Sequence, residues 1–163
     1  MKKIYTDGSS CGNPGKGGYG ICVFDDNDVL VKVEKQRYEN TTNNQAELNG
    51  LLRALEIAQE NMQEQYIIYC DSAYCVNTCK DWIFNWARND WINSKKQEVK
   101  NIDLMKKLYQ YLTIDFPNFK IEKVKGHNEN IGNELADAAA TDDRKKFFKV
   151  INEKAVITSI IDF

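Results

Sequence analysis

The sequence contains a single histidine, His127, and none of its five cysteines forms a Cys-x-x-Cys pair. Zinc centres usually draw on closely spaced cysteine and histidine ligands, so this shortage argues against a zinc site. An odd number of cysteines without such spacing also argues against a disulfide framework. We therefore expect an intracellular protein of the reducing cytoplasm.

Long apolar runs are missing too. No segment approaches the roughly 20 consecutive apolar residues of a membrane span, so we expect no contact with a membrane. A strand-like pattern starts at residue 3 without an apolar leader before it, and we expect no signal peptide. A chain of 163 residues suits a single domain.

An excess of positive charge is also absent, because the formal net charge is −2. Such a balance is unusual for a protein that binds nucleic acid, but a net charge misleads where the charges are segregated. Residues 95–107 hold five lysines against only Glu98 and Asp103. A nucleic-acid ligand therefore remains open.

The hydrophobic pattern alternates between the strand and helix periods. Residues 3–10, 19–25 and 28–36 read as an antiparallel meander. A helix over 43–61, a wholly apolar strand over 65–70 and a last strand over 118–124 follow, with further helices expected at 72–88, 100–112 and 131–145. We predict an α/β fold with a mixed five-stranded sheet, formed by the antiparallel meander plus parallel strands, and helices on both faces.

Four acidic residues stand in unusual settings. Asp7 lies within the first strand, and Asp71 ends the apolar run 66–70. Glu47 lies at the edge of the apolar stripe of the first long helix, and Asp137 lies in the final one. A carboxylate at such positions is costly to bury unless it is paired or holds a metal. The four can meet only if a cation absorbs their repulsion.

The glycine-rich segment 6–20, with its turn at residues 11–18, admits two interpretations. It lacks the Gly-Lys-Ser/Thr ending of a P-loop and leads into a strand rather than a helix, which excludes a phosphate cradle of that type. Taken alone it is typical of a hairpin turn. Next to Asp7 it also suits a backbone that lies close to a ligand.

Four ordered segments resemble ribonuclease H, type 1: Thr6-Asp7-Gly8-Ser9-Ser10-Cys11-Gly12-Asn13-Pro14-Gly15, Thr41-Thr42-Asn43-Asn44-Gln45-Ala46-Glu47-Leu48, Cys70-Asp71-Ser72, and Val124-Lys125-Gly126-His127 with Gly132-Asn133-Glu134-Leu135-Ala136-Asp137. The resemblance implies the ribonuclease H-like fold and a metal-dependent endonuclease. Such an enzyme hydrolyses the RNA strand of RNA–DNA hybrids with two Mg²⁺ ions, which Mn²⁺ can replace, and it leaves 3′-hydroxyl and 5′-phosphate ends.

The same resemblance implies roles for individual residues. Asp7, Glu47, Asp71 and Asp137 would be catalytic metal ligands, with Asp7 the best candidate to bridge the two ions. His127 would be a catalytic residue that shuttles protons or aids product release, a task for which an ordinary imidazole pKa is well placed. The family pattern has a glycine two residues after this histidine, where the present chain has Glu129. We also expect a monomer.

The hybrid-binding residues carry over in the same way. Ser10, Asn13, Asn43 and Asn44 match minor-groove contacts, which must detect 2′-hydroxyl groups. Thr42 and Asn101 match a pocket for a DNA phosphate, although Asn40 stands where the family often has a basic partner. Tyr74 and Trp82 match a channel for the DNA sugar, and residues 82–101 resemble the basic protrusion of the cellular enzymes.

Other interpretations remain beside this one. The chain could be a ribonuclease H domain excised from a reverse transcriptase, but its Met1 and the basic stretch favour a free-standing enzyme. It could be a catalytically silent hybrid-binding module, against which the four acids argue.

We divide the chain into a catalytic domain, residues 1–145, and an apolar C-terminal extension, residues 146–163. The apolar residues of this extension need burial, and they are Phe147, Phe148, Val150, Ile151, Val156, Ile157, Ile160 and Ile161. We expect the extension to pack on its own domain. The alternative is that it docks a partner protein.

Overall fold

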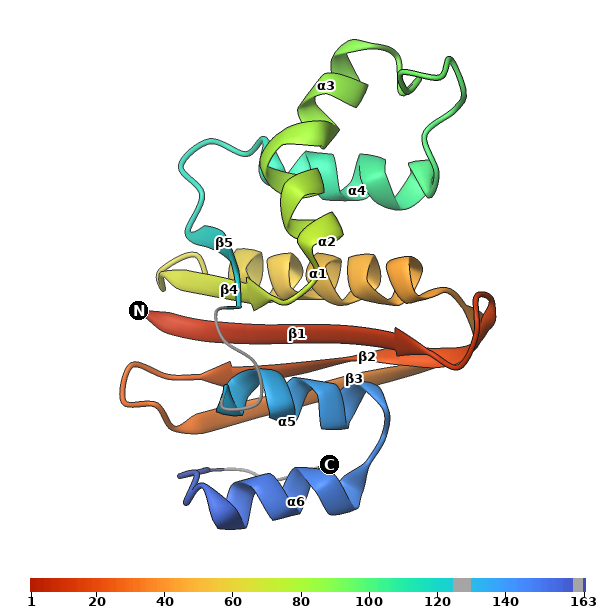
Figure 1. Ribbon diagram of the computed structural model, residues 1–163. Coiled ribbons are helices and arrows are strands. Elements are labelled where there is room, and N and C mark those ends of the chain that lie inside the picture. Colours follow the sequence, from red (N-terminus) through yellow and green to blue (C-terminus); the bar gives the residue numbers. More distant parts are fainter. Residues whose placement is uncertain (125–129, 160–162) are drawn as a thin grey trace.

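The computed structural model describes residues 1–124, 130–159 and 163, and it has one five-stranded sheet at its centre (Figure 1). The strand order is β3-β2-β1-β4-β5. The strand β1 (Lys2–Ser10) therefore lies in the middle, antiparallel to β2 and parallel to β4. The predicted mixed sheet is confirmed.

The antiparallel half is a meander of β1, β2 (Gly15–Phe24) and β3 (Leu30–Thr41). Both β2 and β3 are longer than the sequence pattern predicts. Glycine normally weakens a strand. At Gly17, however, no other residue fits, because an added Cβ would lie only 2.2 Å from the carbonyl oxygen of Ser9. The glycines therefore pair with β1 and β3 at close range, and the turn before them is shorter than we expected.

The parallel half consists of β4 (Tyr66–Cys70) and β5 (Phe119–Lys123). In the register of β1 with β4, Thr6 lies opposite Cys70. The next residues along the two strands are Asp7 and Asp71. Because the strands run in the same direction, the register places these two acids beside each other at one end of the β1–β4 pair.

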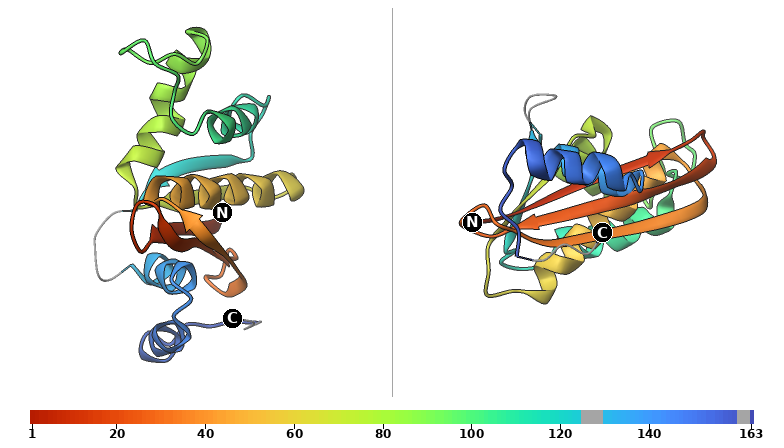
Figure 2. Two further views of the ribbon diagram at one scale, coloured as in Figure 1. Left: turned by 90° about the vertical axis from the view of Figure 1, so that its right-hand side faces the viewer. Right: turned by 90° about the horizontal axis from the view of Figure 1, so that it is seen from below.

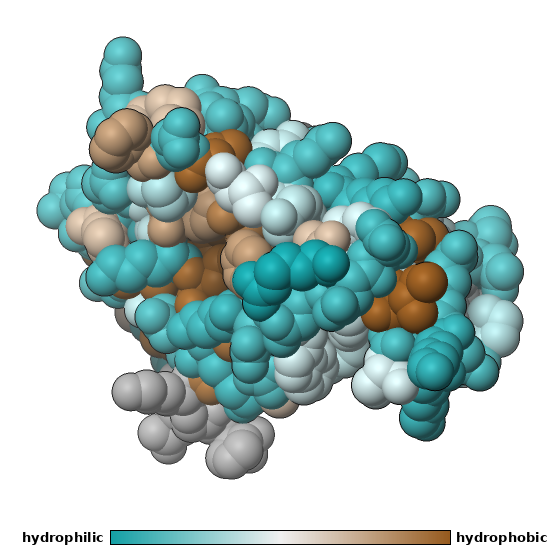
Figure 3. Space-filling model, turned by 90° about the horizontal axis from the view of Figure 1, so that it is seen from above, coloured by the Kyte–Doolittle hydropathy of each residue, from teal (hydrophilic) through white to brown (hydrophobic). Residues whose placement is uncertain are grey.

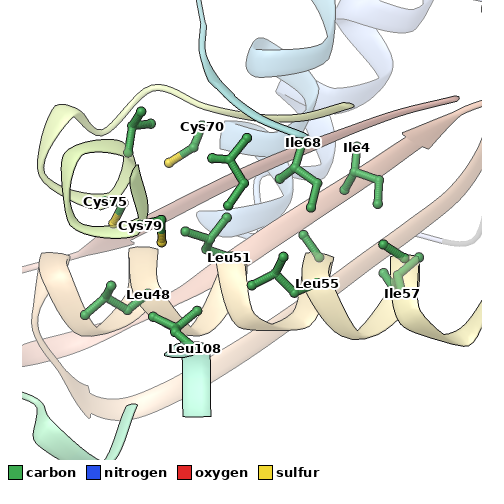
Figure 4. Packing of buried hydrophobic residues seen from close by; sticks show 14 of the residues in the cluster. Ile4, Leu48, Leu51, Leu55, Ile57, Ile68, Cys70, Cys75, Cys79 and Leu108 are labelled. Carbon is green, nitrogen blue, oxygen red and sulfur yellow. The ribbon is translucent and has the colours of Figure 1, made fainter. Parts of the chain in front are cut away.

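On one face of the sheet, α1 (Asn43–Glu60) and α2 (Ala73–Asn77) pack against the strands, and α3 (Ile83–Arg88) and α4 (Ile102–Leu112) lie beyond them, farther from the sheet (Figures 1 and 2). Figure 4 shows Leu51 and Leu55 of α1 on the side that faces Ile68 of the sheet, with Leu48 closer to Cys79 and Leu108. The helix predicted over 72–88 is divided by a π-helical segment, η1 (Thr78–Trp82). Periodicity over so few residues does not reveal that extra residue per turn.

The other face carries α5 (Ile131–Ala140) and α6 (Arg144–Glu153). The prediction of a single helix over 131–145 is wrong at its end. The chain turns at Thr141 and Asp142, and Asp143 then caps a new helix. A second core cluster joins this helix pair to the meander, and its buried members are Cys22, Phe24, Leu30, Leu135, Ala138, Phe147, Val150 and Ile151.

The segment after α6 returns to the meander. The amide of Leu30 donates to the carbonyl of Ile157 at 2.8 Å, and the amide of Ser159 donates to the carbonyl of Leu30 at 3.2 Å. The rings of Phe163 and Phe147 lie 4.6 Å apart. The division drawn at residue 145 falls within the first turn of α6, so it does not coincide with a break in the secondary structure.

None of the helices in the described part of the chain combines the length and the apolar character that crossing a membrane requires. All five cysteines are free thiols; Cys11 is exposed and the other four are buried.

Candidate active site

Three of the four predicted acids share one small site. Carboxylate oxygens of Asp7, Glu47 and Asp71 all lie within 4.8 Å of one another. Asp7 comes from the central strand, Asp71 from the loop directly after β4, and Glu47 from the second turn of α1. Asp7 is 7% exposed and Glu47 is 9% exposed, whereas Asp71 faces solvent. The site is therefore a cluster with a buried floor and an open side.

Gly8 explains how a helix reaches the middle of the sheet. A Cβ at this position would lie 2.4 Å from the backbone nitrogen of Glu47 and 2.5 Å from the carbonyl carbon of Ala46. Any side chain would push α1 away from β1, since the atoms in the way are backbone atoms. The absence of a side chain at Gly8 therefore allows Glu47 to lie next to Asp7.

Asp137 reaches the cluster from the opposite face through α5. A Cβ at Gly20 would lie 2.3 Å from the carbonyl oxygen of Ala136, so glycine on β2 allows α5 to pack directly on the sheet. Asp137 shares a hydrogen bond with Asp7 and accepts another from Lys146 Nζ. The fourth predicted acid therefore joins the other three through Asp7.

The electrostatics of the floor are unfavourable without a cation. Burial, the charge of Glu47 and the hydrogen bond with Asp137 raise the pKa of Asp7 to about 10. Burial and the neighbouring Cys70 raise the pKa of Glu47 to about 9. Clustered carboxylates with hard oxygen donors fit a divalent ion such as Mg²⁺, which would relieve this repulsion.

Two neighbours of the cluster were not predicted from the sequence. The thiol of Cys70 contacts Glu47 Oε2 at 3.7 Å, and Asn133 Nδ2 donates to Asp71 Oδ2 at 3.4 Å. The sequence motifs contain both residues, but a motif does not say which carboxylate each one touches. Cys70 thus orients Glu47 and Asn133 orients Asp71, as groups around metal ligands commonly do.

The predicted minor-groove residues form one hydrogen-bonded group beside the acids. Asn43 Oδ1 accepts from the backbone amide of Ser10 at 2.8 Å, and Asn13 Oδ1 accepts from the amide of Asn43 at 2.9 Å. The Ser10 hydroxyl lies 3.1 Å from Asn13 Oδ1. Asn44 is exposed at the start of α1. The structure thus joins the β1–β2 turn to the start of α1, next to Glu47.

The predicted phosphate-pocket residues are joined by Gln45, which the sequence interpretation did not single out. Thr42 caps α1 by accepting from the Gln45 amide at 3.1 Å, and Gln45 Oε1 accepts from the Thr42 amide at 3.2 Å. Gln45 Nε2 then donates to Asn101 Oδ1 at 3.2 Å. This capping box holds Thr42 and Asn101 on either side of one side chain. Its signal was present as a glutamine three residues after a threonine.

Aromatic residues continue the surface from Asn101. Tyr74 hydrogen-bonds to Asn101, and its ring centroid lies 6.2 Å from that of Trp82. Trp82 in turn lies 6.4 Å from Trp86. These three rings form one wall of a cavity of about 1110 Å³ between α3 and the lysine-bearing turn 93–100. From above, this side of the protein is mainly hydrophilic, with separate hydrophobic patches (Figure 3).

His127, the remaining predicted catalytic residue, lies outside the residues that the structure describes. The described residues on either side of it are Val124, whose amide donates to the Cys70 carbonyl at 3.0 Å, and Asn130, which caps α5. Its predicted role stays a prediction.

Comparison with known proteins identifies the family. The family model for ribonuclease H matches residues 1–145. The chain is 42% identical over 139 residues to a ribonuclease H of Caldicellulosiruptor saccharolyticus, covering 84% of this chain and 91% of that protein. It is 39% identical to a ribonuclease H of Rickettsia canadensis, covering 91% and 92%.

Solved structures agree with this result. The RNase H domain of PFV shares 25% identity at a TM-score of 0.75, over 86% of this chain and 92% of that domain. The N-terminal RNase H domain of rv2228c from Mycobacterium tuberculosis shares 28% identity at a TM-score of 0.63, over 86% of this chain and 96% of that one. The sequence motifs, the sheet order and the acidic cluster therefore belong together: the chain is a member of the ribonuclease H family.

Proposed function

We propose that this protein is an endonuclease that hydrolyses the RNA strand of RNA–DNA hybrids with two Mg²⁺ ions, for which Mn²⁺ can substitute. One observation carries the proposal: Asp7, Glu47 and Asp71 present oxygens within 4.8 Å of one another on a buried floor with one open side. A phosphodiester that enters from the open side would meet this cluster directly.

Asp7, Glu47, Asp71 and Asp137 would hold the ions, with Asp7 as the bridging ligand because it touches both Glu47 and Asp137. When bound, the two ions supply a nucleophilic water and neutralise the charge that develops on the leaving oxygen. The chain itself fixes the carboxylates on a strand, on two helices and directly after the end of β4, so little rearrangement is needed on binding. We infer products with 3′-hydroxyl and 5′-phosphate ends.

The choice of a hybrid substrate follows from the polar group beside the cluster. Ser10, Asn13 and Asn43 present amide and hydroxyl groups that can pair with the 2′-hydroxyls of an RNA strand. Thr42 and Asn101, joined by Gln45, provide the donors for a phosphate of the DNA strand. The two groups lie at the same end of α1, which supports a duplex that crosses this end with RNA over the acids.

The direct test is cleavage of labelled RNA–DNA, RNA–RNA and DNA–DNA duplexes with Mg²⁺ and with EDTA. We expect internal cuts in the RNA of the hybrid only, and only with the metal. Binding of the hybrid without any cleavage in Mg²⁺ or Mn²⁺ would support the silent binding module instead.

Replacing Trp82 by alanine is expected to weaken hybrid binding about tenfold while Mg²⁺ affinity stays unchanged, since loss of an aromatic contact with a nucleotide typically costs 1–3 kcal/mol. The Trp82 side chain is 38% exposed and lies in the middle of the row of rings that runs from Tyr74 to Trp86. Fluorescence anisotropy with uncleaved hybrid in Ca²⁺ would measure it. Ile92→Ala, which removes an exposed side chain from the same cavity, is the control. A change in Mg²⁺ affinity would contradict this map of the groove.

Replacing His127 by alanine is expected to slow turnover by a factor of about 10² to 10⁴, the usual contribution of general acid–base help. Some cleavage should survive because the carboxylates and their ions carry the main chemistry. Single-turnover and steady-state rates at saturating hybrid would separate the cleavage step from product release. An unchanged rate in both measurements would remove His127 from the mechanism.

A further inference from the structure

The ammonium group of Lys146 lies at the acidic cluster, and nothing in the family motifs accounts for it. Lys146 Nζ donates to Asp137 Oδ2, and the two side chains form an ion pair across α5 and α6. Lys146 stands one residue beyond the segment that the ribonuclease H family model matches. The contact therefore belongs to this chain's own C-terminal helix.

The backbone around Lys146 fixes it in place. Asp143 Oδ1 accepts from the Lys146 amide at 3.0 Å and so caps the first turn of α6. The next residue, Phe147, is fully buried between α6 and the meander. A capped first turn and a buried neighbour hold the lysine stem against α5. Asp137 and Lys146 are 39% and 38% exposed, so the pair is partly shielded from solvent.

Other cations of α6 are engaged elsewhere. Lys149 Nζ lies 3.9 Å from Glu153 on the solvent side of the helix. The guanidinium of Arg144 lies over the ring of Phe148, 4.8 Å from its centroid. Lys146 differs from both because its partner is a candidate metal ligand that also hydrogen-bonds to Asp7.

We propose that Lys146 is a positioning residue that holds the Asp137 carboxylate at the cluster in the metal-free protein and competes with a divalent ion for it. This inference rests on the proposed role of Asp137 as a metal ligand. An ion that binds Asp137 either shares the carboxylate with the ammonium group on Oδ2 or displaces that group, so two cations compete for one negative charge. The protein thereby keeps its fourth acid in place before metal binding and binds the metal more weakly.

The experiment compares Mg²⁺ binding by titration calorimetry, without nucleic acid, for the full-length protein and four variants. Lys146→Gln and Lys146→Ala remove the charge, Lys146→Arg keeps it, and Lys149→Ala is a matched control on the same helix. We expect the two neutral variants to bind Mg²⁺ about fivefold more tightly, the effect of losing one partly exposed charge pair. The Arg variant and the control should bind as the wild type does.

Two further readouts make the proposal specific. The Mg²⁺ concentration that gives half-maximal cleavage should fall by the same factor in Lys146→Gln and Lys146→Ala. In EDTA both should melt at a lower temperature than the wild type, because the acids lose their counter-charge. A helix that is merely packed would lower the melting temperature without changing the affinity for Mg²⁺.

Wild-type affinity for Mg²⁺ in both neutral variants would overturn the proposal. Asp7→Asn separates this failure from failure of the metal site itself. If Asp7→Asn abolishes Mg²⁺ binding and the neutral Lys146 variants leave it unchanged, only the role of Lys146 is wrong. If Asp7→Asn binds Mg²⁺ like the wild type, the metal site is misassigned and the role of Lys146 falls with it.

Discussion

Asp7→Asn is expected to abolish cleavage and, in metal-free buffer, to raise the melting temperature. Asp7 is the acid that touches both Glu47 and Asp137, so its loss removes the predicted bridging ligand. Without metal the same carboxylate is buried among like charges, which raises its pKa from 3.8 to about 10. A neutral amide removes that repulsion. The expected loss of rate is several orders of magnitude, because the proposed mechanism depends on the metal ions that Asp7 would hold.

The pH dependence of stability provides the check. A folded protein that raises a carboxyl pKa binds more protons than the unfolded chain between the two pKa values, so its stability falls as pH rises through that range. For Asp7 and Glu47 the range runs from about 4 to about 9–10. Melting in EDTA at pH 5 and pH 9 should show a decline in the wild type that is smaller in Asp7→Asn.

Added Mg²⁺ should reverse the decline in the wild type and have little effect on the variant. An active Asp7→Asn protein, or one that melts below the wild type in EDTA at pH 9, would contradict the assignment of Asp7. Asp115→Asn, at a position far along the chain from the four acids, is the control for the loss of one charge.

Phe147→Ala is expected to destabilise the protein by about 3–5 kcal/mol, the usual range for removing a large buried aromatic side chain. The ring is fully buried and contacts Phe148 and Phe163. For a domain of this size the melting temperature should fall by about 10 °C. Calorimetric or spectroscopic melting would measure the change. Phe148→Ala, at a half-buried neighbour, should cost less.

Deletion of residues 146–163 tests the same packing more severely. It removes Phe147, Val150 and Ile151 from the second core cluster and should expose Cys22 and Leu30. We expect a lower melting temperature and aggregation. A soluble truncated protein with unchanged melting and unchanged cleavage of free hybrid would show that the extension docks a partner instead.

The local sequence was informative where a single charged residue interrupted or ended a regular hydrophobic pattern. An aspartate that follows the five apolar residues of β4, and another inside β1, have few explanations besides pairing or metal binding. The mixed character of the sheet, but not its strand order, followed from the hydrophobic pattern, because three alternating segments precede a wholly apolar one. The position of Glu47 required Gly8 as well, and the sequence gives no distance between a helix and a strand.

Features that depend on contacts between distant segments were not predictable. By composition, nothing separates the alanine-rich helix α5 from the residues that follow it. In the structure, the turn at Asp142 and the cap at Asp143 separate it from α6. The contact between Lys146 and Asp137 depends on the angle of that turn. Gln45 was missed for the same reason. Its capping interaction with Thr42 is local, but its hydrogen bond to Asn101 spans 56 residues.

The central position of β1 has a consequence for amide hydrogen exchange. From Lys2 to Thr6 this strand is bonded on both sides, so the amides that lead up to Asp7 should exchange only when the whole protein opens. The turn 89–101 is mostly exposed, and its backbone hydrogen bonds form only short turns and the isolated bridge between Ile92 and Glu98, so its amides should exchange through small local openings. In mild denaturant, this part of the proposed duplex-binding surface should therefore open locally while Asp7 and the carboxylates near it keep their positions.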